Sequence, residues 1–598
     1  MTGRAAHGTV AGAVGPVVRA VGLDDAVVGE VVHIGRQRLL GEIIGLAGGD
    51  ATIQVYEETG GLQVGDPVAL TGAPLRARLG PGLLGATFDG LQRPLDRLAH
   101  AGRWLLLPGA AGEAGAAGTT GTPGGADARR WRFEPGRRTG DAVVAGDVLG
   151  TVVEGPIHHR ILVPPDVPGG TIRDLDPGSY GADERIGRLE TGTGPVDLRL
   201  SHDWAIRRPR PARRRLGAER PLVTGQRVFD MLFPIAMGGT AVIPGGFGTG
   251  KTVVEQALAR WSDADVVVYV GCGERGNEMA ELLASFPDLV DPRTGDPLLA
   301  RTVLIANTSN MPVAAREASV QLGMTIAEYF RDQGLAVALL ADSTSRWAEA
   351  LREISGRLEE LPGEEGFPAY LGSRLAAFYE RAGRVEALGT PERIGSITLV
   401  GAVSPPGGDF SEPVTQASLR LAGTFWALDV GLAHARHFPA VGWTQSYSLY
   451  VDALSTWYAD HVDPAWAERR AEAIGLLARE KQLLDIVQLV GADALPTADR
   501  VDLETARLMR ETFLQQHAFD PVDASRPLDV QFGLLRAVLA ARTGLRAALD
   551  RGITLETALE APALDELRRA RYWAGDDVEP RLAELTERLL ALGGEIGS

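Results

Sequence analysis

The hydrophobic pattern of the 598-residue chain begins with short apolar runs separated by glycine turns. Positions from about 8 to 75 follow this pattern, and regular short strands with turn signals predict a small closed β barrel. The four clearest runs are 8–12, 26–32, 40–44 and 51–56. A barrel of this kind often serves only to assemble subunits, so we assign it no chemistry.

A second β-rich region follows, with apolar runs at 141–153 and 159–165 around a Gly/Ala/Thr-rich stretch at 108–130. We expect that stretch to be a flexible excursion rather than a core element. His158 and His159 are adjacent, but no Cys or further His lies at metal-ligand spacing. We therefore interpret them as strand or surface histidines rather than metal ligands.

The middle of the chain, from 224 to about 452, alternates apolar strands with helices. The predicted strands are 240–244, 266–270, 302–306, 335–342 and 396–403, and the predicted helices are 252–261, 276–284 and 312–330. Continuous apolar strands separated by helices predict a mostly parallel sheet covered on both faces. The basic, proline-broken run 207–215 precedes this region, and we interpret it as a solvated connector.

Strands disappear after position 464, where 465–490 and 528–549 show helical periodicity. The fold class is therefore multidomain. We expect an N-terminal β barrel (1–75), a connecting region (76–200) with an inserted β-rich domain at about 115–195, an α/β domain (201–455) and a C-terminal helical domain (456–598).

A glycine loop lies between the strand at 240–244 and the helix that follows. It consists of Gly245, Gly246, Phe247, Gly248, Thr249, Gly250, Lys251 and Thr252, and fits the pattern G-x-x-x-x-G-K-[ST]. Glycines let backbone N–H groups converge on phosphates, and the next helix, which continues with Val253, presents its positive end. Lys251 adds charge and Thr252 a hydroxyl for Mg²⁺. Chance glycine turns are common among 75 glycines, but the full pattern between strand and helix favours phosphate binding.

Two carboxylates complete the expected site. Asp342 ends the most apolar strand, where P-loop proteins place the carboxylate on the Mg²⁺ side. Glu274 follows the strand at 266–270, and we assign it as the base that positions water, with Arg275 supporting the phosphate or Glu274. A surface Glu–Arg pair is the alternative, and Glu278 is a rival carboxylate. Cys272 is expected to be structural rather than reactive.

Composition narrows the function classes. Hydrophobic residues make up 45% and charged residues 23%, which is typical of globular proteins. The net charge of −17 argues against non-specific nucleic-acid binding. The single cysteine excludes an internal disulfide and suits a reducing cytoplasm. We find no signal peptide or membrane span in the sequence, so any role at a membrane is expected to come through partners.

With these residues in hand, the chain resembles the catalytic A subunit of V-type and A-type rotary ATPases, in the ATP synthase alpha/beta superfamily. The matching blocks are 269–279, 305–319, 341–365, 401–415 and 437–452. The resemblance covers nearly the whole chain except the Gly/Ala excursion and the C-terminal tail. It implies Mg²⁺–ATP/ADP chemistry in an alternating ring with three non-catalytic B subunits. It also implies central and peripheral stalks, coupling to ion transport, expected to be of protons, by a membrane sector, and a cytoplasmic location on the inner face of the cell membrane.

The resemblance also implies roles for particular residues. Lys251 and Thr252 would bind phosphate and Mg²⁺, and Glu274 would activate water. Phe438 and Phe519 would bracket adenine, although without the resemblance ordinary core packing is preferred. The loop 489–496 would touch the central stalk, and a stabilising arginine would come from the B subunit.

Two departures and two alternatives stay open. Many relatives have Cys where this chain has Thr249, and the segment 419–430 is less typical. A non-catalytic ring subunit usually lacks the complete glycine loop or the catalytic Glu, and this chain has both. A homohexameric export ATPase or RNA translocase is disfavoured by the acidic charge and the inserted β region.

Overall fold

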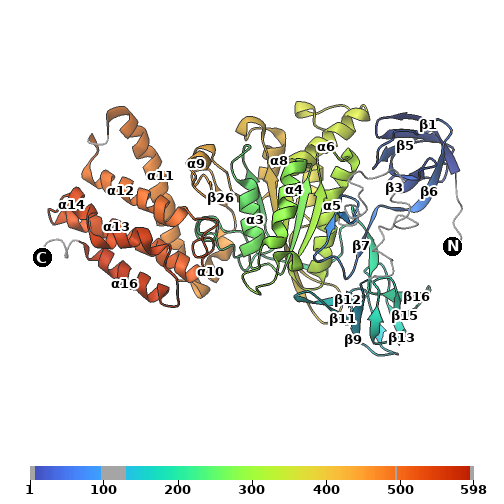
Figure 1. The fold of residues 1–598 in the computed structure, drawn as a ribbon, viewed down its shortest axis with the longest axis horizontal. Coiled ribbons are helices and arrows are strands. Elements are labelled where there is room, and N and C mark those ends of the chain that lie inside the picture. Colours follow the sequence, from blue (N-terminus) through green and yellow to red (C-terminus); the bar gives the residue numbers. More distant parts are fainter. Residues whose placement is uncertain (1–6, 96–128, 492–493, 593–598) are drawn as a thin grey trace. The chain divides into compact units, whose positions relative to one another are not determined.

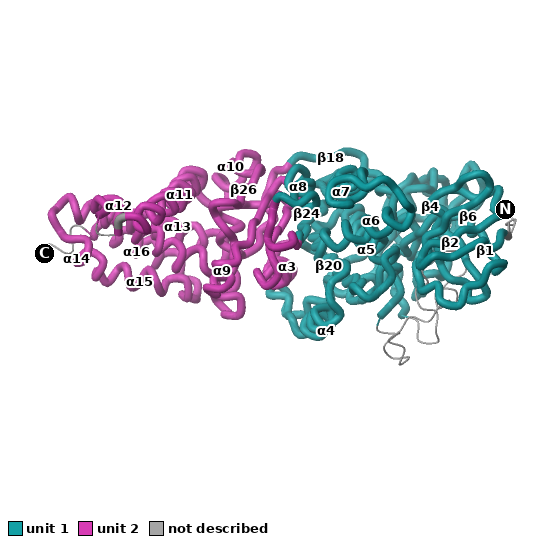
Figure 2. Tube along the Cα trace, turned by 90° about the horizontal axis from the view of Figure 1, so that it is seen from above, with its two compact units in different colours: residues 1–217, 264–403, 411–421 teal, residues 218–263, 404–410, 422–598 magenta. Residues whose placement is uncertain are grey.

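The computed structural model describes residues 7–95, 129–491 and 494–592 (Figure 1). The predicted excursion 108–130 therefore lies almost wholly outside the described residues. The chain divides into two compact units, which Figure 2 colours separately. Unit 1 contains residues 1–217, 264–403 and 411–421, and unit 2 contains residues 218–263, 404–410 and 422–598.

Unit 1 begins with the predicted barrel, whose strands close in the order β1-β2-β5-β4-β3-β6. The strands are β1 (His7–Val14), β2 (Val17–Val21), β3 (Glu30–Ile34), β4 (Leu39–Ala47), β5 (Asp50–Val55) and β6 (Pro67–Pro74). Alternate side chains such as Val18, Ile34 and Ile53 fill its interior. The strand expected at 26–32 is placed too early in the sequence, because β3 begins only at Glu30 and Val27 is 63% exposed.

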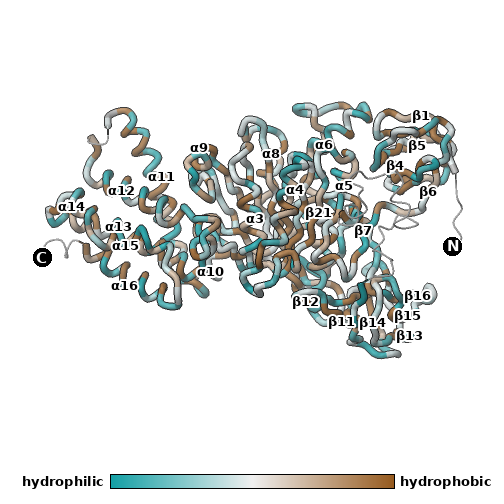
Figure 3. Tube along the Cα trace, in the orientation of Figure 1, coloured by the Kyte–Doolittle hydropathy of each residue, from teal (hydrophilic) through white to brown (hydrophobic). Residues whose placement is uncertain are grey.

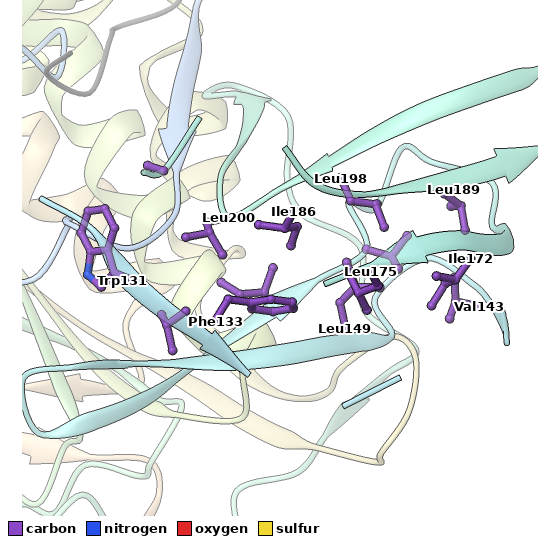
Figure 4. Close-up of a cluster of buried hydrophobic side chains, with 14 residues drawn as sticks. Trp131, Phe133, Val143, Leu149, Ile172, Leu175, Ile186, Leu189, Leu198 and Leu200 are labelled. Atoms are coloured by element: carbon purple, nitrogen blue, oxygen red, sulfur yellow. The ribbon is translucent and has the colours of Figure 1, made fainter. Parts of the chain in front are cut away.

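The inserted region, also in unit 1, forms two four-stranded sheets, β10-β13-β15-β16 and β12-β11-β9-β14. Their bounds are β9 (Trp131–Pro135), β10 (Ala142–Val143), β11 (Val148–Glu154), β12 (Ile157–Leu162), β13 (Gly170–Leu175), β14 (Gly178–Tyr180), β15 (Arg185–Thr191) and β16 (Gly194–Arg199). Apolar side chains from both sheets form one core, in which Phe133, Leu149 and Leu189 are fully buried (Figure 4).

The two histidines differ within β12. His158 is exposed, whereas His159 is fully buried and its ring nitrogens contact Glu154 Oε2 and Tyr329 Oη, each at 2.6 Å. Tyr329 belongs to α5 (Val313–Asp332), so His159 joins the inserted region to the nucleotide-domain part of unit 1. The strand assignment is confirmed for both residues.

The basic run 207–215 is only partly the expected solvated connector: Arg208, Arg214 and Arg215 are exposed, but other arginines of the run are held by carboxylates. Arg210 has no exposed side-chain surface and its Nε lies 2.7 Å from Asp332 Oδ2. Arg207 pairs with Glu42 and Glu317, and Arg213 with Glu386. The acceptors come from β4, α5 and β23 (Gly383–Glu386), so the run is held by carboxylates that are distant in sequence.

The parallel sheet of unit 1 contains the strands β24-β22-β20-β21-β8 in that order. They are β8 (Thr87–Phe88), β20 (Val266–Cys272), β21 (Thr302–Asn307), β22 (Ala336–Asp342) and β24 (Ile394–Val403), and neighbouring strands are parallel. Almost every residue of β20, β21 and β22 is buried, as continuous apolar runs require, and Figure 3 shows this hydrophobic concentration around β21. The predicted mostly parallel sheet is confirmed.

Unit 2 contains the strand, loop and helix of the glycine motif and the helical C-terminal region. Strand β19 (Thr240–Pro244) pairs in parallel with β25 (Thr424–Phe425), and β25 pairs with β26 (Tyr447–Ser448). The C-terminal helices are α10 (Val451–His461), α11 (Trp466–Val490), α12 (Thr497–Leu508), η7 (Met509–Leu514), α13 (Leu528–Asp550), α14 (Leu555–Leu559), α15 (Pro562–Ala570) and α16 (Val578–Leu590). The predicted helices at 465–490 and 528–549 correspond to α11 and α13.

The segment 419–430 contains a close approach between a glycine and a tyrosine. A Cβ on Gly423 would lie 2.4 Å from the Tyr450 ring, and Gly423 N–H donates to Thr240 Oγ1. The small residue therefore lets β25 reach β19. Within the described residues, none of the helices is long and apolar enough to cross a bilayer.

Candidate functional site

The glycine loop connects β19 to α3 (Lys251–Trp261) in unit 2. Gly248 and Gly250 have φ angles of 76° and 86°, a backbone conformation that other residues adopt only with strain. Lys251 Nζ donates to the carbonyl oxygens of Gly245 at 2.7 Å and Gly246 at 3.0 Å. The lysine ammonium thus lies over the loop backbone, at the N-terminal end of α3.

Thr249 and Thr252 have different environments. Thr249 is 2% exposed, and its hydroxyl donates to Gly246 O at 2.8 Å. A threonine at this position therefore closes the loop with a hydrogen bond that a cysteine would make only weakly. Thr252, in the first turn of α3, is exposed, as is Phe247 at the tip of the loop. Val253 contributes to the cavity described next.

A cavity of about 410 Å³ adjoins the loop within unit 2. Its lining combines the end of the glycine loop with two distant segments of the C-terminal half, 433–440 and 515–519. Phe438 and Phe519, the expected adenine-binding pair, both line it. Phe519 is 87% exposed, which is unusual for a phenylalanine in ordinary core packing.

The cavity suits an adenine nucleotide on its own geometry. Its volume falls in the range of small-molecule sites, and two phenylalanines are among the residues that line it, a residue type that can stack on a flat base. The glycine loop at one end provides backbone N–H groups and Lys251 for the phosphates. Base, sugar and phosphates would therefore extend from the phenylalanines towards the loop.

The expected carboxylates lie in unit 1, at the ends of two neighbouring parallel strands. Gly271 of β20 is paired with Asp342 of β22, so the chain leaves both strands at the same sheet edge. Asp342 is 5% exposed and its Oδ2 accepts a hydrogen bond from Tyr269 Oη at 3.1 Å. Glu274 lies just past β20, and its carbonyl oxygen accepts from Ser309 N–H at 2.9 Å.

Glu274 is strongly perturbed. Burial, the charge of Asp342 and hydrogen bonding to Glu278 raise its pKa to about 8, and Arg346 opposes this rise. Such a cluster of carboxylates with one arginine is typical of functional sites. Arg275 is 59% exposed at its side chain, and its Nη1 lies 3.9 Å from Glu278 Oε1. The structure therefore brings Glu274, Glu278 and Asp342 together, with Arg275 at the rim.

Sequence reasoning missed Arg346, which lies on α6 (Thr344–Arg357) directly after β22. Its Nη1 donates to both oxygens of Glu349, at 2.9 and 3.0 Å. Gly273, with φ of 73°, packs so closely that a Cβ there would lie 2.6 Å from Arg346 Cβ. The available signal was its position four residues after Asp342, at the start of the helix that leaves the strand.

Cys272 is structural, as expected. It is fully buried, and its Sγ donates to Arg316 O at 3.5 Å. Burial raises the pKa of its thiol to about 12, so it holds its proton at neutral pH. Within the described residues, no group of His, Cys, Asp and Glu side chains forms a metal cluster. That Glu274 faces the glycine loop stays a prediction.

A strand, glycine loop and helix with carboxylates at the ends of parallel strands define a P-loop nucleotide-binding protein of the α/β class. The chain belongs to the ATP synthase alpha/beta family. The family's nucleotide-binding domain matches residues 225–448, and its β-barrel and barrel-sandwich domains match 6–72 and 123–207. The C-terminal domain of V and A type ATP synthase matches 455–554.

Curated relatives match over nearly the full length of the chain. V-type ATP synthase alpha chain 1 of Clostridium tetani is 52% identical over 97% of each chain. The A subunit of the A-type ATP synthase of Methanopyrus kandleri is 52% identical over 96% of each. V-type ATP synthase alpha chain of Acetivibrio thermocellus is 50% identical over 98% of each. This similarity supports the V/A-type catalytic subunit over the alternatives.

Among solved structures, the chain is similar in fold to the assembled ATPase EscN of the enteropathogenic E. coli type III secretion system. The TM-score is 0.63 at 22% sequence identity, covering 89% of this chain and 100% of EscN. This likeness shows a shared fold alone.

Proposed function

We propose that this chain is the catalytic A subunit of a V/A-type rotary ATPase, which hydrolyses or synthesises ATP and couples that chemistry to stalk rotation and proton transport. The observation that carries the proposal is the cavity in which the glycine loop, Phe438 and Phe519 come together. The relatives, which are named as ATP synthase subunits, provide independent support.

In this proposal, different residues of the chain bind the phosphates, hold the adenine and orient the attacking water. Loop N–H groups and Lys251 bind the β- and γ-phosphates, and Phe438 and Phe519 hold adenine between them. Glu274 accepts a hydrogen bond from the attacking water and orients it towards the γ-phosphorus. Arg275, exposed beside Glu278, binds charge that develops on the transferred phosphoryl group.

Thr252 and Asp342 are the groups proposed to hold Mg²⁺, Asp342 through water, because hard cations prefer hydroxyl and carboxylate oxygens. When bound, the metal neutralises charge on the phosphate oxygens. A nearby cation would also lower the pKa of Glu274 from about 8. Glu274 would then be ionised when substrate is present.

The proposed assembly is an alternating ring of three copies of this chain and three non-catalytic B subunits, with a stabilising arginine from each B subunit. Central and peripheral stalks and a membrane ion-translocating sector complete it. The complex would lie at the cytoplasmic face of the cell membrane. Leu489, 84% exposed at the end of α11, belongs to the segment proposed to touch the central stalk.

Reconstitution tests this function. The chain would be purified alone and together with a B-like subunit, and native mass and Mg²⁺-dependent ATP hydrolysis measured for both. We expect steady turnover only in the mixed ring. An active homohexamer of this chain alone would contradict the proposal and favour the export-ATPase class.

A further inference from the structure

The segment that carries Phe519 has no helix or strand of its own. Residues 515–523, here called the base loop, lie between η7 and α13. The stretch 515–519 contributes five consecutive residues to the lining of the nucleotide cavity. A loop without a backbone hydrogen-bond ladder keeps one shape only if other groups satisfy and hold its polar atoms.

Arg227, next to η1 (Val228–Leu232), supplies most of that support. Its side chain is completely buried. Its Nε donates to Phe513 O at 2.6 Å, its Nη1 to Asp523 Oδ1 at 2.6 Å and its Nη2 to Gln515 O at 2.7 Å. Its backbone N–H donates to Gln516 Oε1 at 2.6 Å. One planar guanidinium thus fixes both ends of the base loop.

Arg571 reaches the same loop from the other side. It follows α15, lines the nucleotide cavity and has 14% of its side chain exposed. Its Nη1 donates to Glu511 O at 2.7 Å and Gln515 O at 3.1 Å. Its Nε lies 3.9 Å from Asp523 Oδ2. Arg227 and Arg571 therefore converge on the same carbonyl and the same carboxylate.

Arg227 also connects the base loop, which carries Phe519, to the segment that carries Phe438. Asp523 Oδ2 accepts from His517 N–H at 2.8 Å, which draws the loop back on itself. Gln516, oriented by Arg227 N–H, donates its own backbone N–H to Phe438 O at 2.6 Å. The spacing between the Phe438 and Phe519 segments thus depends on the contacts of Arg227 and Asp523.

We propose that Arg227 and Arg571 are positioning residues that hold the base loop in the shape that presents Phe519 to the nucleotide base, so that they determine affinity for the base and not for the phosphates. The inference rests on the proposed nucleotide site. Arg571 lies beyond the residues that match the family's C-terminal domain.

The test compares Mg²⁺–ATP with Mg²⁺–tripolyphosphate, which has the phosphates but no base, by calorimetry on the full chain. We expect Arg571→Ala to weaken ATP binding about fivefold to tenfold, since it removes hydrogen bonds to Gln515 O in the base loop and to Glu511 O just before it. Tripolyphosphate binding should stay within about twofold. Arg571→Lys should restore much of the ATP affinity, because one ammonium reaches both carbonyls.

Arg568→Ala is the matched control. Arg568 lies in α15, the helix that Arg571 follows, pairs with Asp565 and is 37% exposed at its side chain. It should change neither affinity. Arg227→Lys should lower ATP affinity alone, because an ammonium cannot replace three divergent donors. Melting temperatures of every variant identify those that no longer fold.

The possible outcomes distinguish failure of this inference from failure of the proposed function. Equal losses for ATP and tripolyphosphate in folded Arg571→Ala would show a general structural role and overturn the inference, as would unchanged ATP affinity. Wild-type chain that binds tripolyphosphate as tightly as ATP would overturn it too. Wild-type chain that binds neither ligand would instead overturn the proposed function itself.

Discussion

The two halves of the proposed site are built in different ways. In the glycine loop, Lys251 hydrogen-bonds carbonyls five and six residues away, so one short stretch of sequence contains the whole phosphate-binding device. The carboxylate cluster assembles Glu274, Asp342 and Arg346 from the ends of β20 and β22 and the start of α6. In the proposed site, the phosphate-binding residues are therefore local in sequence, whereas the residues proposed to activate water come together only through tertiary structure.

The electrostatics differ as well. The loop offers backbone dipoles and one lysine, which favour an anion without any other group. The carboxylate cluster crowds like charges, so its members favour a cation or a proton. Substitutions in the first region should therefore change nucleotide affinity, and substitutions in the second should change turnover.

The largest effect is expected from Glu274→Gln. It keeps the shape of the side chain but removes the acceptor that orients water, so steady-state ATP turnover of the assembled ring should fall about 10²- to 10⁴-fold. Equilibrium binding of Mg²⁺–ATP should change less than about twofold. Glu278→Gln is the control carboxylate and should reduce turnover far less. Near-normal turnover in Glu274→Gln would remove Glu274 from the mechanism.

Lys251→Ala, in contrast, should lower ligand affinity. Loss of a charge-assisted contact to phosphate should weaken Mg²⁺–ATP and Mg²⁺–tripolyphosphate alike, by about tenfold to 100-fold in calorimetry. Equal weakening of both ligands is the signature of a phosphate contact. A loss confined to ATP would place Lys251 near the base and break the comparison.

Asp230 is a buried carboxylate outside the carboxylate cluster, and its substitution should change stability rather than turnover. Burial raises the pKa of Asp230 to about 6, although Thr224, Gly225 and Gln531 donate hydrogen bonds to it. Because the folded pKa lies above the unfolded value, the protonated form favours folding. The stability contribution is largest below about pH 4 and is lost as pH rises through 6.

Asp230→Asn isolates this contribution. The free energy of unfolding in urea, measured between pH 4 and pH 7, should fall with rising pH by about 2 kcal/mol more in the wild type than in the variant. A difference between the two proteins that stays constant across this range would show that the Asp230 pKa is not raised.

The smallest expected effect is that of Phe519→Ala. Its ring is 87% exposed, so its removal should leave the melting temperature unchanged. Loss of stacking should weaken ATP binding about tenfold and leave tripolyphosphate binding unaltered. Phe519→Trp should retain ATP affinity. A lower melting temperature with unchanged ATP affinity would favour ordinary packing over base binding.

Much of the fold was predictable because continuous apolar runs report buried strands directly. The run 240–244 coincides with β19, and 302–306 and 335–342 differ from β21 and β22 by one residue. The barrel strand at 26–32 was wrong because Val27 is apolar but exposed, and local hydrophobicity does not distinguish a buried valine from one on the surface.

What sequence reasoning missed depends on distant pairs. Arg207 to Arg213 look like a solvated basic run, yet Arg210 meets a carboxylate 122 residues away. Arg227 lies 296 residues from Asp523. No local pattern predicts these contacts, whereas the glycine loop carries its own partners in eight consecutive positions.

The central claim is that the two halves meet on one phosphate, and a crystal structure of the chain with its B-like partner and a non-hydrolysable Mg²⁺–ATP analogue tests it most directly. We expect Lys251 Nζ within about 3 Å of a γ-phosphate oxygen and the Glu274 carboxylate one water molecule away from the γ-phosphorus. A γ-phosphate bound by Lys251 with Glu274 turned away from it would contradict the account.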